Sequence, residues 1–153
     1  MAGGIIPPEA AAFLQRPLMA RFITVAPGSE PHFTYVWFEY DGQDLLVSTQ
    51  MSTHKVAHIA QNPQVCIVLD DPDNIWRHLI VNGTAEVTRD GAFDLLERMV
   101  TRYFADTPER WGPYVEGKRS QDRVVVRITP QRVQHRNIVP AEPAVVGTRA
   151  VYR

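Results

Sequence analysis

The sequence has little net charge, one cysteine and no long apolar run, and each shortage excludes a class of protein. Sixteen Lys and Arg residues nearly balance seventeen Asp and Glu residues, so no broad electrostatic attraction to a nucleic acid is expected. The single cysteine, Cys66, cannot form an internal disulfide, and its apolar neighbours predict a buried, inert thiol. No apolar run approaches the ~20 residues of a membrane helix, and residues 1–12 do not resemble a signal peptide. We therefore expect a soluble, cytoplasmic protein.

Motifs of the common nucleotide-binding folds are also missing. The chain has neither a G-x-G-x-x-G sequence nor a Walker-type loop, which disfavours a Rossmann or NTPase fold. It has no internal repeat, and its 153 residues fit one domain with a sizeable core. We predict a single domain over residues 1–139, followed by a tail at 140–153 that is loose or wraps a neighbour.

Runs of β-branched and aromatic residues predict a mainly β protein with about six strands. Consecutive strands are not joined by regular helical crossovers, so an antiparallel barrel is favoured over a parallel sheet. Helical spacing or proline-led starts predict helices at residues 8–14, 56–61 and 91–104, with a short piece at 107–114. The strands are expected at residues 19–25, 32–40, 45–49, 65–69, 75–88 and 123–129.

Three details of these strands carry structural expectations. Residues 32–40 are apolar on both alternating faces, so one face is expected to fill the barrel. The other face would meet a helix, a cofactor or a second subunit. Asn82-Gly83 fits a hairpin turn or a bulge, and we favour a bulge within one continuous strand. Pro130 is expected to end a strand, leaving a short last strand at 132–139.

Residues 48–55 combine hydroxyls with one lysine at the start of a helix. Such a helix N-terminus suits a phosphate group, because free backbone amides and positive charge converge there. Lys55 is the main candidate for phosphate contact. Thr53 suits either an N-cap or a phosphate contact, and Thr49 suits either a strand end or a cofactor contact.

Other polar residues are interpreted as structural. His54 and His58 have the spacing of a metal pair on one helix face, but no further ligands complete a site, so no metal is predicted. Asp70, Asp71 and Asp73 are interpreted as turn-forming residues, since no calcium-loop pattern follows them.

Several of these segments together resemble the pyridoxamine-phosphate-oxidase-like split-barrel family, which includes oxidoreductases that bind FMN or the deazaflavin F420. The resemblance covers residues 18–139 and depends on the order of weak motifs rather than on one signature. The motifs lie at residues 45–49, 53–55, 62–65, 81–87 and 123–130.

The resemblance implies a six-stranded antiparallel split β-barrel that forms a homodimer, with two cofactors in grooves at the dimer interface. Thr49 and Lys55 would then contact the cofactor phosphate, and the strand with Val36 and Trp37 would lie along the ring system. The other implied cofactor contacts are Ser52, Thr53 and His54 beside the lysine, and Arg77 and His78 on the next strand.

The chain also departs from the pattern of true pyridoxamine phosphate oxidases. It has Phe33 and His54 where that pattern has arginines, and residues 134–137 do not match the substrate-binding arginine motif. The short chain and residues 111–118 look more like the deazaflavin-dependent branch, so F420 is favoured over FMN.

The resemblance thus implies an oxidoreductase that transfers a hydride between F420 or FMN and a small organic substrate. No catalytic residue is identified, although a bound water or Tyr114 could supply a proton. The alternatives are a non-catalytic protein that carries flavin, F420 or haem, and a flavin-free structural dimer.

Overall fold

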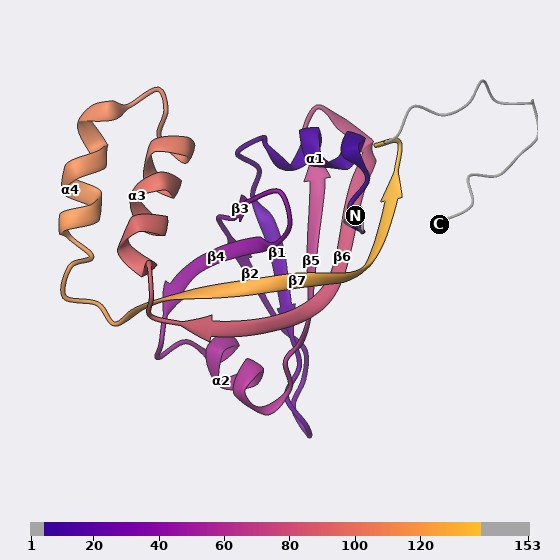
Figure 1. The fold of residues 1–153 in the computed structure, drawn as a ribbon, viewed down its shortest axis with the longest axis horizontal. Coiled ribbons are helices and arrows are strands. Elements are labelled where there is room, and N and C mark those ends of the chain that lie inside the picture. The colour runs from indigo at the N-terminus through magenta and orange to yellow at the C-terminus, as the bar shows by residue number, and fades with distance from the viewer. Residues whose placement is uncertain (1–4, 139–153) are drawn as a thin grey trace, which may run out of the picture.

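A computed structural model describes residues 5–138 and shows a mainly antiparallel sheet curled into a half-barrel with flanking helices (Figure 1). The strand order is β2-β1-β5-β6-β7-β4-β3, and every pairing is antiparallel. The predicted fold class is therefore confirmed, with seven strands rather than six. The elements are α1 (Pro8–Leu14), β1 (Ala20–Thr24), β2 (His32–Val36), β3 (Glu39–Tyr40), β4 (Leu45–Gln50), α2 (His54–Gln61), β5 (Gln64–Asp71), β6 (Asn74–Thr88), α3 (Ala92–Tyr103), the 3-10 turn η1 (Pro108–Arg110), α4 (Trp111–Glu116) and β7 (Arg123–Arg136).

The predicted strand at 32–40 is interrupted between β2 and β3. At the interruption, the backbone amide of Phe38 donates to the hydroxyl of Tyr103 over 3.1 Å, and that hydroxyl donates to the carbonyl of Leu18 over 2.7 Å. A side chain from α3 therefore replaces the strand partner at this point. Because Tyr103 is distant in sequence, the strand's own residues did not reveal the break.

The expected break at Pro130 was wrong, because β7 runs without interruption from Arg123 to Arg136. Pro130 lies opposite Gly83, where the register between β6 and β7 shifts. Proline is tolerated at such an irregularity because it has no N–H to donate to the ladder.

The register shift falls between Asn82 and Gly83, and β6 continues through it. The predicted continuous strand is thus confirmed over the hairpin, but the extra residue at the irregularity belongs to β7: Arg132 lies opposite Asn82 and Pro130 opposite Gly83, which leaves Gln131 unpaired in the ladder. A Cβ added at Gly83 would lie 2.4 Å from the carbonyl oxygen of Thr129, so only glycine allows the two strands to approach this closely.

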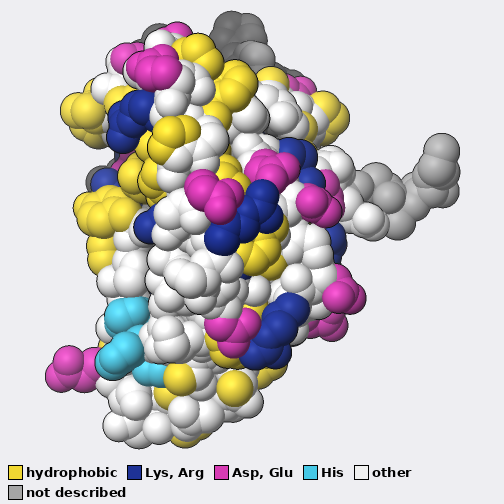
Figure 2. Space-filling view, turned by 90° about the vertical axis from the view of Figure 1, so that its left-hand side faces the viewer, with side chains coloured by type: hydrophobic (Ala, Val, Ile, Leu, Met, Phe, Trp, Pro, Cys, Tyr) yellow, Lys and Arg dark blue, Asp and Glu magenta, His cyan; other side chains and the backbone are white. Residues whose placement is uncertain are grey.

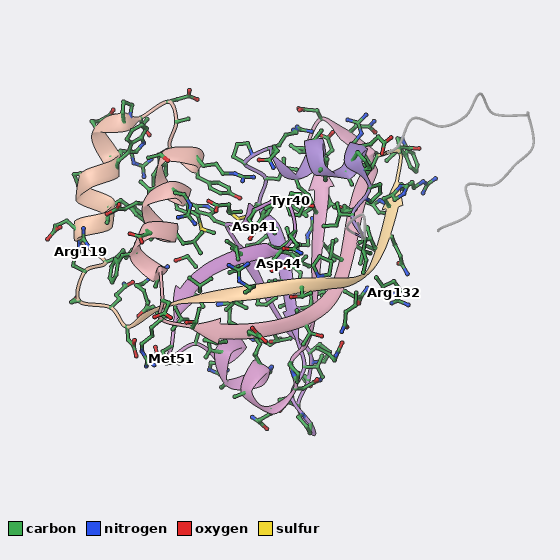
Figure 3. All side chains as sticks on the ribbon, viewed as in Figure 1. Tyr40, Asp41, Asp44, Met51, Arg119 and Arg132 are labelled. Carbon is green, nitrogen blue, oxygen red and sulfur yellow. The ribbon has the colours of Figure 1, made fainter. Side chains whose placement is uncertain are left out.

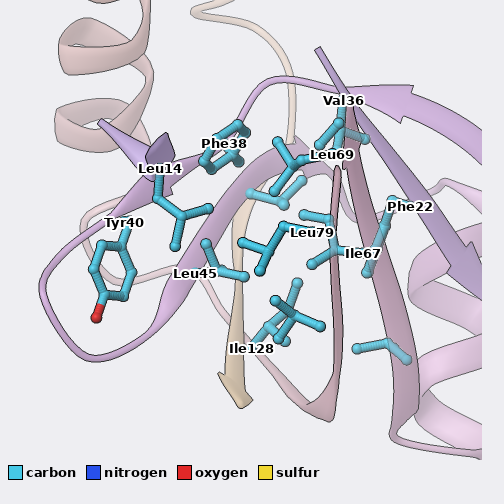
Figure 4. Close-up of a cluster of buried hydrophobic side chains, with 14 of the residues drawn as sticks. Leu14, Phe22, Val36, Phe38, Tyr40, Leu45, Ile67, Leu69, Leu79 and Ile128 are labelled. Atoms are coloured by element: carbon cyan, nitrogen blue, oxygen red, sulfur yellow. The ribbon is translucent and has the colours of Figure 1, made fainter. Parts of the chain in front are cut away.

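The inside of the half-barrel holds the main core (Figure 4). In residues 36–40, the alternate side chains Val36, Phe38 and Tyr40 are buried in this core. This agrees with the prediction that one face of residues 32–40 fills the barrel. Trp37 faces the other way and stacks on Tyr103 of α3, with ring centroids 4.8 Å apart. The main cluster also contains Leu14, Phe22, Leu45, Ile67, Leu69, Leu79 and Ile128.

A second apolar cluster attaches α3 to the outer face of β4 and β7. Leu95 and Met99 of the helix pack with Leu46 and Val125 of the strands. This packing follows from the helical spacing of apolar residues in α3. Helix α4 packs beside α3, away from the sheet, and Arg119 follows it there (Figures 1 and 3).

The expectations for Cys66, for the C-terminal tail and for a membrane helix are compared with the structure in turn. Cys66 is partly exposed rather than buried, and burial of its surroundings still raises the pKa of the thiol. The expected C-terminal tail at 140–153 lies outside the described residues. No helix within residues 5–138 combines the length and apolar character that crossing a membrane requires.

Candidate functional site

A pocket of about 250 Å³ opens where the end of β4 meets α2, α3, α4 and the start of β7. In Figure 3 this is the side of the sheet marked by Met51, which follows β4, whereas Arg132 lies toward the other end of β7. The pocket is lined by Met19, Tyr35, Val36, Trp37, Ser48, Thr49, Gln50, Lys55, Leu96, Met99, Tyr114 and Arg123.

Lys55 is the more buried of the two cations in this lining, with 8% of its surface exposed. Its ammonium donates to the hydroxyl of Thr49 over 3.5 Å. Burial lowers the pKa of Lys55, and the nearby positive charge of Arg123 lowers it further. Both effects penalise the charged lysine, and a bound anion would oppose them.

Arg123 is the second cation, held by neutral partners only. Its Nη2 donates to the hydroxyl of Ser48 over 2.6 Å, and its Nη1 donates to the side-chain oxygen of Gln121 over 3.1 Å. Its Nε is buried and has no partner within residues 5–138. Burial lowers the pKa of this guanidinium too.

Neither cation makes an ion pair within the described part of the chain, and no Asp or Glu lines the pocket. Buried charges are normally paired, because removing an ion from water without compensation is costly. Lys55 and Arg123 thus form a site whose charge and free donor suit an anionic group such as a phosphate.

A family comparison agrees with this geometry. Residues 6–137 match the model of the Pyridoxamine 5'-phosphate oxidase family. The chain belongs to this family.

Three individual proteins illustrate the similarity of this family member to known chains. A solved F420 reductase is 30% identical, with a TM-score of 0.67 over 80% of this chain and 93% of that one. General stress protein 26 of Bacillus subtilis is 26% identical over 114 residues, which are 74% of this chain and 76% of the relative. A conserved hypothetical protein of Mycobacterium tuberculosis shares the fold, with a TM-score of 0.70 and 23% identity over 99% of this chain and 98% of that one.

Four of the residues that the family resemblance assigned to the cofactor line the pocket together: Val36, Trp37, Thr49 and Lys55. The structure brings them together because the interruption after β2 and the end of β4 face the first turn of α2.

Three other assigned residues flank the pocket of this family member without lining it. Ser52 and His54 are exposed. Thr53 occupies the N-cap position of α2, but its hydroxyl donates to the carbonyl of Gln50 over 2.9 Å and makes no capping bond. The expected side-chain cap is therefore absent, and the Thr53 hydroxyl lies 3.5 Å from that of Thr49.

Arg77 and His78 lie on β6 and do not line the pocket. The Nη1 of Arg77 is 3.1 Å from the carboxylate of Asp71, and its Nε donates to the carbonyl of Asn137. Asp71 is buried and also meets Arg16 over 2.8 Å, which holds its pKa below the usual value. Within one copy of the chain, Arg77, Asp71 and Arg16 form a structural network outside the pocket lining.

Sequence reasoning missed Arg123 as a site residue, although it noticed the strand that begins there. Arg123 lies opposite Gln50 in the β4–β7 register, a pairing between distant segments that local patterns do not show. The sequence feature that could have identified Arg123 is its position as a cation directly before the apolar residues 124–126. Leu96 and Met99 lie in the helix predicted at residues 91–104, and the structure shows that they form a wall of the pocket.

A second pocket, of about 320 Å³, adjoins the first and shares Met19 and Tyr35 with it. Its lining is mostly apolar, and its two charged residues, Arg21 and Asp70, form an ion pair with each other. This compartment therefore presents no uncompensated charge and suits an uncharged ligand.

Within residues 5–138, no three His, Cys, Asp or Glu side chains are arranged to hold a metal ion.

Proposed function

We propose that this chain binds F420 or FMN non-covalently and transfers a hydride between that cofactor and a small organic substrate. The observation that supports this most directly is a pair of cations without carboxylate partners, the buried Lys55 and the partly buried Arg123, beside the hydroxyls of Ser48 and Thr49. A cofactor phosphate matches this donor set. The similarity to an F420 reductase favours F420 over FMN.

The residues of this chain would supply binding, orientation and exclusion of water. Lys55 and Arg123 would hold the phosphate, and Trp37 would present an apolar wall along the ring system. Leu96 and Met99 of α3 would keep water from the pocket. The bound cofactor would supply the hydride chemistry, as is general for such enzymes.

We also propose that two copies of the chain complete the site. The pocket in one copy, about 250 Å³, is below the ~300–1,000 Å³ typical of a complete ligand site. The neighbouring outer face of β1 and β2 is unusually apolar for a free surface. Met19 is 50%, Phe33 47% and Tyr35 61% exposed, and the last two rings contact each other edge to face. A second copy packed on this face would bury these side chains beside the cofactor.

The substrate would occupy the adjoining compartment, because that pocket shares Met19 and Tyr35 with the proposed cofactor pocket. Its internally neutralised charges favour an uncharged, mostly apolar molecule. The hydride would then pass across the boundary that Met19 and Tyr35 form.

A non-catalytic carrier of the same cofactor is the second candidate. It is favoured by the absence of His, Asp and Glu, the commonest general acids and bases, from the pocket lining within the described residues. Lys55, Tyr35 and Tyr114 are the lining residues of the other types that can serve in that role.

The test is an absorption titration of the purified protein with FMN, F420 and haem in separate experiments. Tight F420 or FMN binding is expected, and Lys55→Ala should weaken it while Lys118→Ala, which changes the chain's other lysine outside the pocket lining, should not. Binding of haem alone would overturn the proposal. Oxidation of reduced cofactor that depends on an added substrate would distinguish an enzyme from a carrier.

A further inference from the structure

One histidine of β2 and two histidines of α2 meet at one surface of the molecule. The ring of His32, on β2, stacks on that of His54 with centroids 5.5 Å apart and 24° between the ring planes. His32 also contacts His58, one turn further along α2, edge to face at 5.7 Å. Figure 2 shows histidine side chains gathered on this exposed face. We call these three residues the histidine cluster.

The histidine cluster continues the positive end of the pocket. His54 directly precedes Lys55 on α2, and the Nδ1 of His58 lies 3.2 Å from the hydroxyl of Thr24 on β1. Burial lowers the pKa of His32, and the charges of His54, Lys55 and His58 lower it further. Protonating the cluster thus places several positive charges side by side.

An acidic side chain lies beside the histidines in Figure 2, but no ion pair joins a carboxylate to them within the described residues. Glu30, the acid nearest to His32 in sequence, is exposed on the loop between β1 and β2. A metal would require ring nitrogens that converge on one point. The stacked rings of His32 and His54 lie nearly parallel instead, and residues 5–138 contain no suitable metal-binding group.

We propose that His32, His54 and His58 form a proton-dependent subsite for a second anionic group on a ligand whose first anionic group is held by Lys55 and Arg123. This inference rests on the proposed function for the position of the first group. Each imidazolium has two N–H donors, whereas the neutral ring has one. The subsite therefore binds weakly above neutral pH and strengthens as the histidines take up protons.

By linkage, an anion that prefers the protonated cluster must raise the pKa values of its histidines. The probes are methanesulfonate, which has one negative charge, and a series of alkanedisulfonates, which have two. Sulfonates stay ionised between pH 5 and pH 8.5, so only the protein titrates. Nuclear magnetic resonance of the imidazole carbon-bound protons follows each histidine separately.

We expect a disulfonate of matching length to raise the pKa values of His32, His54 and His58. His78 and His135 lie on β6 and β7 and serve as internal controls that should not respond. Affinity for the disulfonate should increase about tenfold or more from pH 8 to pH 5.5, since a charge-assisted hydrogen bond contributes ~1.5–3 kcal/mol. Methanesulfonate should show a clearly smaller increase.

Two variants test the assignment: His54→Gln, which changes the exposed histidine, and the double variant His54→Gln/His58→Gln. Glutamine at position 58 keeps the capacity to hydrogen-bond with Thr24. They should flatten the pH dependence by lowering the affinity at pH 5.5 much more than the affinity at pH 8. Equal pKa values of the cluster with and without disulfonate would overturn the subsite, as would a selective response of these histidines to Zn²⁺ but not to the anion.

A separate outcome identifies failure of the proposed function. If Lys55→Ala leaves disulfonate affinity unchanged while the three histidines still respond, the subsite stands and the first anion position is wrong. If Lys55→Ala lowers affinity equally at pH 5.5 and pH 8 while the histidines do not respond, the first position stands and the subsite is wrong.

Discussion

Arg123 donates a 2.6 Å hydrogen bond to Ser48 across the β4–β7 ladder and so holds a guanidinium in the pocket without a carboxylate partner. Arg127, on the same strand, has the opposite environment: its Nη1 meets the carboxylates of Asp41 and Asp44 at 3.0 and 2.9 Å. One strand thus carries a neutralised arginine and an uncompensated one, and the uncompensated one faces the pocket.

Replacing Arg123 should weaken anion binding specifically. Arg123→Gln removes one charge-assisted hydrogen bond to the ligand, so FMN or F420 affinity should fall about 10- to 150-fold, equivalent to ~1.5–3 kcal/mol. Equilibrium titration followed by absorption or fluorescence measures the loss. Arg127→Gln is the matched control and should leave the affinity within about twofold. Equal losses in the two variants would mean that general surface charge, rather than Arg123, attracts the ligand.

Removing the buried charge of Lys55 should stabilise the ligand-free protein. Folding lowers the pKa of Lys55 from its ordinary 10.5, so between the two values the unfolded chain binds more protons. The free energy of unfolding therefore rises with pH through that window, and the penalty is fully present below it. Lys55→Met should raise the melting temperature at pH 7, with the advantage shrinking toward pH ~10. A lower melting temperature at pH 7 would contradict this account, and the same variant should lose cofactor binding.

The hydroxyl of Tyr103 should matter for folding rather than for binding. It donates to the carbonyl of Leu18 and accepts from the amide of Phe38. Tyr103→Phe leaves both backbone groups without this partner and should cost ~1–3 kcal/mol in urea unfolding. The hydroxyl of Tyr114 makes no hydrogen bond within residues 5–138, so Tyr114→Phe is the control with little expected change. Comparable losses in both variants would argue against the bridging role of Tyr103.

The close approach of β6 to β7 at Gly83 should depend on glycine. Gly83→Ala places a Cβ 2.4 Å from the carbonyl oxygen of Thr129, so the β6–β7 ladder must shift. The expected cost is ~1–3 kcal/mol, measured by thermal or urea unfolding. Gly112, in α4, has open space around an added Cβ, and Gly112→Ala should be neutral or slightly stabilising. Wild-type stability in Gly83→Ala would show that the strands can separate at little cost.

The proposed homodimer makes the outer face of β2 sensitive to charge. Phe33→Asp should convert dimers to monomers, because burying an unpaired carboxylate at an interface is unfavourable. Light scattering coupled to gel filtration measures the mass. Ile75→Asp changes an apolar residue that is 80% exposed elsewhere, and it should leave the dimer intact. A monomeric wild-type protein, or dissociation by both variants, would exclude this face as the specific contact.

Most of the fold followed from local patterns. The apolar spacing of α3, the β-branched run of β5 and the continuity of β6 through Gly83 each depend on neighbouring residues, and each is present in the structure. The two errors in the strand boundaries depend on distant partners. Tyr103 interrupts the strand at Phe38, and the displaced register opposite Gly83 accommodates Pro130 within β7.

The same distinction separates the predicted from the unpredicted part of the site. Lys55 stood out because its helix start and neighbouring hydroxyls are adjacent in sequence. Arg123 and the partnership of His32 with His54 did not, because they depend on which strands become neighbours. Arg77, whose assignment came from the family resemblance, instead pairs with Asp71 in this chain.

Trp37 gives the pocket its own optical reporter. Its indole lines the cavity and stacks on Tyr103, while Trp76 is 58% exposed on β6 and Trp111 donates its ring N–H to the carbonyl of Phe104. The three tryptophans of this chain, which dominate its fluorescence, therefore occupy distinct environments. Quenching that disappears in Trp37→Phe but survives in Trp76→Phe would record occupancy directly, without a label and before any substrate is known.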